Sequence, residues 1–490
     1  MPGTPHTTQL AVIGAGPGGY AAAFLAADLG LQVTLIDPEP QPGGVCLYRG
    51  CIPSKALLHV AKLLDEARQA TRWGVTFAAP TIDVEKLRAW KESVVHKLTG
   101  GLADLCQRRH VAYIQGRATF RNATTLAVHT ASGEDIEVTF TQAIVATGSQ
   151  PATLPRLAVD WRDGVGAGRS PSPRLLDSTS ALALTDIPRT LLVIGGGYIG
   201  LEMGSVYAAL GTQVSVVEMT AGLLPGVDRD LVHVLSRRLE QSLAAIMLNT
   251  TVVAMQAAVD GISVTFEGAE LQQPQQVFEK VLIAVGRRPH SQGLGLENTR
   301  VEIDQRGFIT VDAQRRTAEP SIYAIGDVAG EPMLAHKATH EGRIAVEAIA
   351  GHKVAFEPHA IPAVVFTDPE IAWCGLTETQ AKQEGRRIEV ARFPWAASGR
   401  AMTLDRTDGV TKLILDPETG RVLGVGLAGS GAGELIAEGV LAVEMAALAS
   451  DVALSIHPHP TLSETLMEAA EAFSGQSTHI YRPQRRRSSA

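Results

Sequence analysis

Two segments of the chain repeat one pattern, and this repetition constrains the fold more than any other feature of the sequence. Residues 10–37 and residues 191–218 align without a gap. Each contains an apolar strand, the glycine pattern G-x-G-x-x-G, a helix of small residues, a Leu-Gly pair, a second β-branched strand and a final carboxylate. This order is typical of a dinucleotide-binding βαβ unit, in which a pyrophosphate lies at the helix N-terminus. We therefore expect the chain to bind two dinucleotides.

The glycines and carboxylates of each unit have separate expected roles. The first glycine allows a tight turn, the second lets a pyrophosphate approach the backbone, and the third lets the helix pack closely on the strand. The final carboxylate is placed to bind ribose hydroxyls. These residues are Gly14, Gly16, Gly19 and Asp37 in the first unit, and Gly195, Gly197, Gly200 and Glu218 in the second.

The two units are expected to bind different dinucleotides. Glu218 repels a 2′-phosphate, and Met219 and Thr220 after it supply no arginine, so the second unit should prefer NAD(H) to NADP(H). The first unit directly precedes a cysteine pair, so its ligand should exchange electrons with sulfur. Flavin can accept hydride and can also exchange electrons with a thiolate, whereas nicotinamide moves hydride. The consistent assignment is FAD in the first site and NAD in the second.

Two of the four cysteines, Cys46 and Cys51, lie close together after the first unit, in GGVCLYRGCIPSKALLH at 43–59. A helix is expected to begin at Cys51, where unpaired N–H groups and the positive end of the helix dipole lower the pKa of a thiol. Two buried cysteines that happen to be close are the plainer alternative. A zinc half-site is disfavoured, because the spacing is unusual for zinc and no second pair exists.

Composition limits the classes of function that remain. A chain of 490 residues is expected to form two to four domains, and 48 glycines with 45% hydrophobic residues suit a compact α/β protein. The net charge of −8 argues against a nucleic-acid partner. The sequence shows neither an apolar run that would span a membrane nor a signal peptide. Sparse cysteine predicts a cytoplasmic protein, in which a persistent disulfide is usually catalytic.

Several motifs together resemble those of the flavoprotein disulfide reductases, the class I pyridine nucleotide-disulfide oxidoreductases, and most closely those of the dihydrolipoyl dehydrogenases. The likeness covers nearly the whole chain. It is carried by the cysteine segment and, in the family's order, by ATGSQP at 146–151, AVGRRP at 284–289, IYAIGDVAG at 322–330, MLAHKATHEG at 333–342 and HPHPTLSETL at 457–466.

The resemblance implies an α/β fold with two Rossmann-like dinucleotide-binding domains, for FAD and NAD, and a C-terminal α+β dimerisation domain. The expected bounds are 1–155 for the first part of the FAD domain, 156–286 for the NAD domain, 287–355 for the central and second FAD part, and 356–490 for the interface domain with a basic, disordered tail. It also implies an obligate homodimer in which each active site takes its histidine from the partner. From the residues alone, the interface domain shows two strand-like runs, VTKLIL and VLGVGLAG, and an Ala-rich helix at 433–449; an interface role and plain core packing are equally open for that helix.

The activity that the resemblance implies is the oxidation of dihydrolipoamide by NAD+ through the disulfide and FAD. By resemblance, a substrate thiolate attacks Cys46, and Cys51 lies against the flavin. His459 is the candidate base, and such a base typically contributes roughly 10²–10⁴-fold in rate. Glu464 would fix the tautomer of its imidazole. From the residues alone, a core or surface histidine beside a helix-starting glutamate is the alternative. A metal pair with His457 lacks further ligands, so no metal site is expected.

Further residues are expected at the cofactors. Lys55 follows Cys51 by one helical turn and lies near the flavin by resemblance, with Glu202 as its partner; exposed helix charges are the alternative. The complete FAD set is Gly14, Gly16, Gly19, Asp37, Lys55, Ala118, Thr147, Gly148, Ser149, Asp327 and Ala335. The complete NAD set is Gly195, Gly197, Gly200, Glu202, Glu218, Val252, Gly286 and Arg287.

Four places depart from the family pattern or lie outside it. Tyr48 and Arg49 between the cysteines are expected to alter the disulfide channel and hence the choice of substrate, and Pro458 separates two histidines. Residues 156–174 are rich in Gly, Pro and Ser and read as a flexible surface loop. The two remaining cysteines are expected to be small buried hydrophobes; they are Cys106 and Cys374.

Other functions stay open at this point. One alternative is an NAD(P)H-dependent reductase of a different disulfide. A glutathione-type reductase, which uses NADPH, would be expected to carry basic residues after the second unit, where Glu218 stands. A non-catalytic scaffold that keeps a flavin would not need the cysteines, the lysine–glutamate pair and the histidine–glutamate pair together. The expected partner is a lipoyl domain of a 2-oxo acid dehydrogenase complex acyltransferase or another lipoyl protein, and the sequence leaves open which one.

Overall fold

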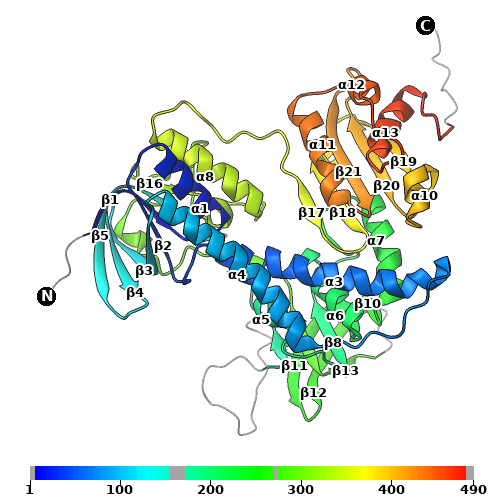
Figure 1. The fold of residues 1–490 in the computed structure, drawn as a ribbon, viewed down its shortest axis with the longest axis horizontal. Helices are drawn as coiled ribbons and strands as arrows, with labels where there is room; N and C mark the ends of the chain where they lie inside the picture. Colours follow the sequence, from blue (N-terminus) through cyan, green and yellow to red (C-terminus); the bar gives the residue numbers. More distant parts are fainter. Residues whose placement is uncertain (1–5, 155–172, 270–272, 482–490) are drawn as a thin grey trace.

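A computed structural model describes residues 6–154, 173–269 and 273–481. Nearly all of the predicted loop at 156–174 lies outside these ranges, as does the basic tail beyond Tyr481. Figure 1 shows three lobes: a sheet with its helices on the left, a second sheet below, and a third sheet at the upper right. Helices α3 and α4 run between them.

The first lobe is built on a six-stranded sheet. Strands β3, β2, β1, β5 and β16 lie in this order and pair in parallel, and β4 pairs antiparallel with both β3 and β5. Helices α1 and α8 lie in contact with each other. The bounds are β1 His6–Ile13, α1 Pro17–Asp28, β2 Val33–Asp37, β3 Ala112–Asn122, β4 Thr125–Thr130, β5 Asp135–Val145, β16 Ile322–Ala324, the short helix η4 Gly326–Ala329 and α8 Ala335–Ile349. The chain therefore returns to its first sheet after building the second.

The second lobe has a parallel sheet of order β10-β9-β8-β14-β7 and a separate antiparallel sheet of β11, β12 and β13. The chain enters this lobe through β6 and leaves it through β15, and these two strands pair antiparallel. The bounds are β6 Ser149–Pro151, β7 Leu175–Leu176, α5 Ser178–Ala183, β8 Thr190–Ile194, α6 Tyr198–Leu210, β9 Gln213–Val217, α7 Arg229–Ser242, β10 Ala245–Met247, β11 Thr250–Ala258, β12 Gly261–Gly268, β13 Gln275–Phe278, β14 Lys280–Ile283 and β15 Arg287–Pro289. After β15 the short helix η3 Leu296–Asn298 packs on β3 of the first lobe.

The third lobe is an antiparallel sheet of order β17-β18-β21-β20-β19, with α11 packed on β18 and β21 and α13 on β19 and β20. The two predicted strand runs form β20 and β21. The single helix predicted over 433–449 is wrong: two helices, α11 and α12, cover this region, because Ala446 has a left-handed φ of 54° that ends the first. The bounds are β17 Ala363–Val365, β18 Glu370–Gly375, α9 Glu378–Gln383, β19 Glu389–Pro394, η5 Trp395–Ala397, α10 Gly399–Thr403, β20 Val410–Leu415, β21 Val422–Gly429, α11 Ala432–Glu444, α12 Ala449–Leu454 and α13 Glu464–Ser474.

Four further helices connect the lobes: α2 Gly44–Arg49, α3 Cys51–Gln69, η1 Ala70–Trp73 and α4 Val84–Arg108. Cys51 is the first residue of α3, as predicted, and α3 packs against α6 of the second lobe. Cys106 in α4 and Cys374 in β18 are 3% and 1% exposed, which confirms their prediction as buried residues.

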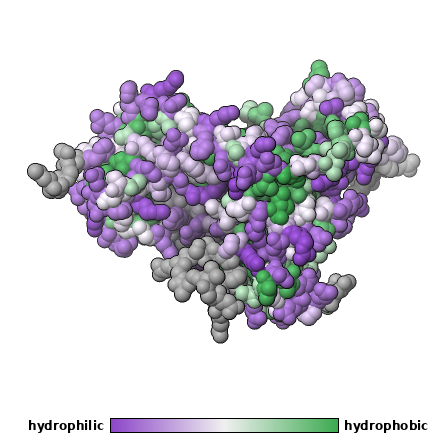
Figure 2. Space-filling model, turned by 60° about the horizontal axis from the view of Figure 1, so that its bottom comes forward, coloured by the Kyte–Doolittle hydropathy of each residue, from purple (hydrophilic) through white to green (hydrophobic). Residues whose placement is uncertain are grey.

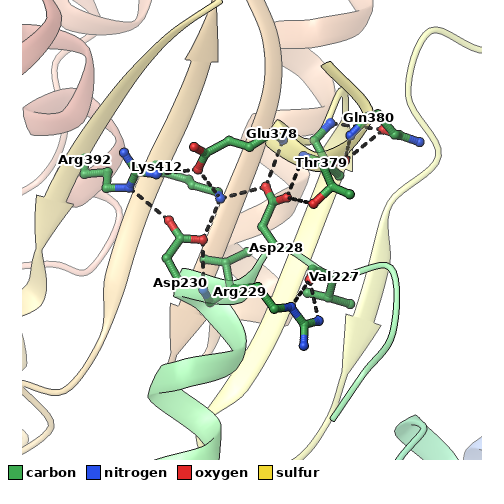
Figure 3. A network of polar contacts seen from close by, with 11 residues as sticks. Val227, Asp228, Arg229, Asp230, Glu378, Thr379, Gln380, Arg392 and Lys412 are labelled. Atoms are coloured by element: carbon green, nitrogen blue, oxygen red, sulfur yellow. Dashed lines mark hydrogen bonds and ion pairs between the residues drawn. The ribbon is translucent and has the colours of Figure 1, made fainter. Parts of the chain in front are cut away.

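An ion network joins the second lobe to the third (Figure 3). Lys412 Nζ on β20 lies 2.7 Å from Asp228, 2.7 Å from Asp230 and 2.8 Å from Glu378, and Arg392 also contacts Asp230 and Glu378. Burial works to lower the pKa of Lys412, but its hydrogen bonds to carboxylates outweigh burial and raise that pKa. Within the described ranges, the three acids are the one group of side chains close enough to share a metal ion, and the lysine ammonium lies among them.

The surface is mixed in polarity. The face in Figure 2 is largely hydrophilic, with hydrophobic side chains gathered in separate areas. Among the described residues, no helix is long and apolar enough to cross a membrane.

Candidate active site

A cavity of 920 Å³ lies where α2 and α3 meet the first and second lobes. Most of the predicted FAD residues line it: Gly14, Gly16, Asp37, Lys55, Ala118, Thr147, Gly148, Ser149, Asp327 and Ala335. Cys46 and Cys51 line it as well, and so do Glu202 and Arg287 from the predicted NAD set. The structure therefore brings the cysteine pair together with residues predicted for both cofactors.

The glycines of the first unit fit a dinucleotide. Gly14 has a φ of 100°, and a Cβ there would lie 2.3 Å from the Ala146 carbonyl oxygen. Gly16 is the N-cap of α1, so the helix N-terminus points into the cavity where a pyrophosphate would bind. The cavity volume also falls within the range of about 300–1,000 Å³ that is usual for ligand sites.

The carboxylate of the first unit lies at one end of this cavity. Asp37 is 7% exposed; it accepts hydrogen bonds from the Ala15 N–H at 2.6 Å and from the Glu39 N–H at 2.9 Å. Burial raises the pKa of Asp37 to about 6. This position marks the ribose end of the predicted FAD site.

The two cysteines are free thiols on neighbouring helices, Cys46 in α2 and Cys51 at the start of α3. A hydrogen bond between the thiols raises the pKa of Cys46 and lowers the pKa of Cys51. The Lys55 ammonium lowers the pKa of Cys51 further. When the reduced pair loses one proton, the negative charge is therefore held on Cys51.

Lys55 is held between α6 and the third lobe. Its Nζ donates to both carboxylate oxygens of Glu202, at 2.9 and 3.2 Å, and lies 4.3 Å from the centre of the Phe366 ring. Glu202 is 3% exposed and also accepts the Phe366 N–H at 3.0 Å. The predicted pair is thus brought together, whereas Phe366 was not predicted and no local motif in the sequence marks it.

Arg287 contacts residues that were predicted for the other cofactor. Its Nε donates to Ser149 Oγ and its Nη2 to the Ser149 carbonyl, both at 2.7 Å. Ser149 Oγ in turn donates to Asp327 Oδ2 at 2.5 Å. The three residues form one polar chain along the cavity, at the point where β6 and β15 pair.

The second unit repeats the geometry of the first at its carboxylate. Glu218 is 7% exposed and accepts the Gly196 N–H at 2.7 Å and the Thr220 N–H at 2.8 Å. Gly195 has a φ of 110°, and Gly197 is the N-cap of α6. The other predicted NAD residues lie elsewhere: Gly200 packs against Gly195 in the third-glycine position, Gly286 precedes β15, and Val252 is 6% exposed in the core of the second lobe.

The predicted histidine–glutamate pair is formed in the third lobe. His459 Nδ1 lies 2.9 Å from Glu464 Oε1, and the other oxygen of this carboxylate accepts the Thr461 N–H at 2.8 Å. The His459 side chain is 71% exposed, so its outer nitrogen is open. Among the residues that the structure describes, neither His459 nor Glu464 lines the cavity with the cysteines. His457 contacts a different carboxylate, Glu438, at 2.8 Å.

The two unusual residues between the cysteines contact residues 38–41, and Arg49 also lines the cavity that holds Cys46 and Cys51. Their expected effect on the disulfide channel stays a prediction. The Tyr48 hydroxyl donates to the Gln41 carbonyl at 3.1 Å, and Arg49 forms an ion pair with Glu39. Both contacts run from α2 to the segment that follows Asp37. Pro458, the third departure, accepts a hydrogen bond from Thr461 Oγ1 through its carbonyl at 2.7 Å.

One further aromatic residue lines the cavity and was missed. Tyr198 is the first residue of α6, inside the second glycine pattern, and burial raises the pKa of its hydroxyl. Tyr198 belongs to the pattern assigned to the other dinucleotide, so no signal in the sequence placed it in this cavity.

Comparisons with known proteins agree with this architecture. Residues 8–342 match the family model described as pyridine nucleotide-disulphide oxidoreductase, and residues 361–470 match the dimerisation domain of the same family. The chain is 48% identical over 473 residues to dihydrolipoyl dehydrogenase of Haemophilus influenzae, with 96% of each chain covered. It is also 48% identical over 472 residues to dihydrolipoyl dehydrogenase of Vibrio cholerae, covering 96% of this chain and 97% of that one.

Two solved structures are similar over nearly the whole chain. LpdA from Mycobacterium tuberculosis has a TM-score of 0.85 at 27% identity, covering 95% of this chain and 99% of its own. The HOCl-induced flavoprotein disulfide reductase RclA from Escherichia coli, solved as a Cu(II) complex, has a TM-score of 0.83 at 29% identity, covering 96% and 99%. The predicted fold class is confirmed.

Proposed function

The chain belongs to the pyridine nucleotide-disulphide oxidoreductase family, and we propose that within this family it oxidises protein-bound dihydrolipoyl groups to the cyclic disulfide with NAD+. It is an NAD-dependent oxidoreductase whose cofactors are FAD and NAD. Support for the dihydrolipoyl substrate comes from relatives named dihydrolipoyl dehydrogenase at 48% identity.

The observation that carries the proposal is the cysteine pair in the cavity. Cys46 and Cys51 share a hydrogen bond that leaves charge on Cys51, beside the Lys55 ammonium. In the oxidised state of the pair, a substrate thiolate attacks Cys46 Sγ, a mixed disulfide forms, and the Cys46–Cys51 bond breaks to release the Cys51 thiolate. The second substrate thiolate then attacks the mixed disulfide, which releases Cys46 and the cyclic product.

Protons leave through a base. The exposed imidazole of His459, held by Glu464, is suited to accept the proton of the first attacking thiol. That proton passes to the Cys46 sulfur as it leaves, and the imidazole then accepts the proton of the second thiol, so it never holds more than one transferred proton. Because this imidazole lies outside the cavity of its own chain, the proposal assigns the role to the partner's His459. The matched dimerisation domain supports a homodimer.

FAD bound in the first site would supply the redox chemistry that links the dithiol to NAD+. The residues that would hold it are the predicted set along the cavity, among them Asp37, Ser149, Asp327 and Lys55. The overall change is dihydrolipoyl plus NAD+ to lipoyl plus NADH and one proton.

The same proposal includes the domain bounds at 155, 286 and 355. It also includes the remaining assignments to the FAD and NAD sites. The partner, a lipoyl domain of a 2-oxo acid dehydrogenase complex acyltransferase or of another lipoyl protein, is part of it as well. The sparse cysteines support a cytoplasmic location.

A second candidate is reduction of another disulfide. The likeness to RclA, a flavoprotein disulfide reductase, favours it. Glu218 separates the two candidates in one respect, because its charge disfavours NADPH, whose use would accompany many reductive roles.

An anaerobic assay tests the proposal. Holoenzyme is mixed with dihydrolipoamide and NAD+. NADH formation is followed together with the long-wavelength charge-transfer band between the Cys51 thiolate and FAD. We expect NADH formation that needs both cysteines and prefers NAD+. A strict preference for NADP+, or full turnover in Cys51→Ser, would contradict it.

A further inference from the structure

Two of the four residues between the cysteines, Tyr48 and Arg49, contact the chain next to the ribose position of the cofactor cavity. Tyr48 and Arg49 lie on α2, and their partners Gln41 and Glu39 belong to the segment Pro38–Gln41. This segment begins directly after Asp37, the carboxylate that marks the ribose position. The helix that carries Cys46 therefore also contacts the opposite end of the dinucleotide site.

The same segment is bound from its other side by β3. The Tyr113 hydroxyl donates to the Glu39 carbonyl at 2.8 Å, and Gln115 Nε2 donates to the Pro38 carbonyl at 3.2 Å. Residues 38–41 are thus contacted both by β3, a strand of the first sheet, and by α2, a helix of only six residues. Contacts from α2 close the segment against the cavity.

Arg49 supplies the charged contact between α2 and residues 38–41, through its ion pair with Glu39. It lines the cavity together with Asp37 and Glu39, and its Nε is buried without a hydrogen-bond partner. Burial raises the pKa of Asp37, and the nearby Arg49 guanidinium acts in the opposite direction. A buried donor that has no protein partner and lies along a ligand cavity is suited to a ligand or an ordered water.

We infer that Tyr48 and Arg49 hold the Pro38–Gln41 segment closed over the adenosine end of FAD and so determine how slowly FAD dissociates. Arg49 is a positioning residue in this arrangement, acting through Glu39 and Asp37. The inference rests on FAD in the first dinucleotide site, which is part of the proposed function. It assigns the departures between the cysteines to cofactor retention and not to the choice of dithiol.

The test measures FAD dissociation from holoenzyme diluted into FAD-free buffer, through the rise in flavin fluorescence. Arg49→Gln and Glu39→Gln each remove the ion pair, and we expect FAD to leave about tenfold faster, the effect of one charge-assisted contact. Because the residues act as one pair, the double variant should lose FAD no faster than Arg49→Gln alone. Tyr48→Phe should act in the same direction.

Arg387→Gln is the matched control. It removes an arginine from an ion pair with Glu418 in which both side chains are at least 80% exposed, and it should leave FAD dissociation unchanged. Glu39→Gln keeps the arginine, so it carries the test if Arg49→Gln does not fold.

Two outcomes would overturn the inference: dissociation of FAD from Arg49→Gln at the wild-type rate, or an effect of that variant confined to KM for dihydrolipoamide. The same measurements distinguish a wrong substrate from a wrong role for Arg49. A wild-type protein that does not oxidise dihydrolipoamide, but whose Arg49→Gln variant releases FAD faster, would contradict the substrate and support the inference.

Discussion

Glu202 Oε2 lies 2.9 Å from Lys55 Nζ, although the two residues are 147 positions apart in the chain. The contact joins α3, which begins at Cys51, to α6, the helix of the second dinucleotide unit (Figure 1). Lys55 lowers the pKa of Cys51, whereas Glu202 raises it. The charge at the reactive sulfur is therefore set by two opposing side chains.

Substitutions in this pair should shift the pKa of Cys51 in opposite directions. Lys55→Met removes the cation that favours the thiolate and should raise that pKa, on the order of one pH unit. Glu202→Gln removes an anion that disfavours the thiolate and should lower it. A pH titration of the charge-transfer band between the Cys51 thiolate and FAD in reduced holoenzyme measures both pKa shifts. Shifts in the same direction would show that the pair acts by packing and not by charge.

His459→Ala should slow dithiol oxidation without loss of FAD. The lost base predicts a decrease of roughly 10²–10⁴-fold in kcat. The ratio of flavin to protein absorbance measures FAD retention in the same sample. An equal loss of flavin and of activity would make His459 a structural residue.

Mixed dimers should show that the histidine acts across the subunit interface. A dimer of one Cys51→Ser subunit and one His459→Ala subunit contains one complete site if the partner supplies the base, so about half of the wild-type activity is expected. If each chain used its own histidine, both sites would be inactive. The control is a dimer that carries both substitutions in one subunit and none in the other. It has no complete site if the partner supplies the base, whereas about half of the activity would remain if each chain used its own histidine.

Lys412→Met should destabilise the contact between the second and third lobes. Lys412 is 1% exposed, and its removal leaves the buried Asp228 carboxylate without its cation, whereas Asp230 and Glu378 keep Arg392. Removing one partner of a buried ion pair typically costs about 3–5 kcal/mol. Urea unfolding of the FAD-loaded protein measures the loss. Lys353→Met, at an exposed position, is the control.

The same cluster predicts a pH dependence. Burial acts to raise the pKa values of Asp228 and Asp230, but Lys412 outweighs it together with backbone N–H donors at Asp228 and Arg392 at Asp230, and both values are lowered. Their contribution to stability is thus complete above the unfolded pKa of about 3.9 and is lost as the pH falls toward the folded values. Lys412→Met should weaken this pH dependence, because Asp228 then keeps only its neutral donors and Asp230 only Arg392 against the effect of burial. Unfolding curves at several pH values would contradict this if both proteins lost stability in parallel on acidification.

The features that could be predicted from the sequence are those set within a few residues. Gly14 and Gly195 stand at turns that need a positive φ, and Cys51 begins a helix, because each depends on local backbone geometry. The prediction of a single helix over 433–449 was wrong, because it rested on the composition of that stretch alone. Its composition favours a helix throughout, and the break at Ala446 comes from how α11 and α12 pack on the third lobe.

The sequence by itself determined that the chain contains two dinucleotide units, a reactive cysteine pair between them and the family to which these motifs belong. Only the tertiary structure decided that Arg49 turns toward Glu39, that Arg287 contacts Ser149 across 138 positions, and that His459 lies away from the cysteines. The physical reason is the range of the interactions. A glycine turn or a helix start is specified by neighbouring residues, whereas a contact between distant segments exists only after separate lobes have packed.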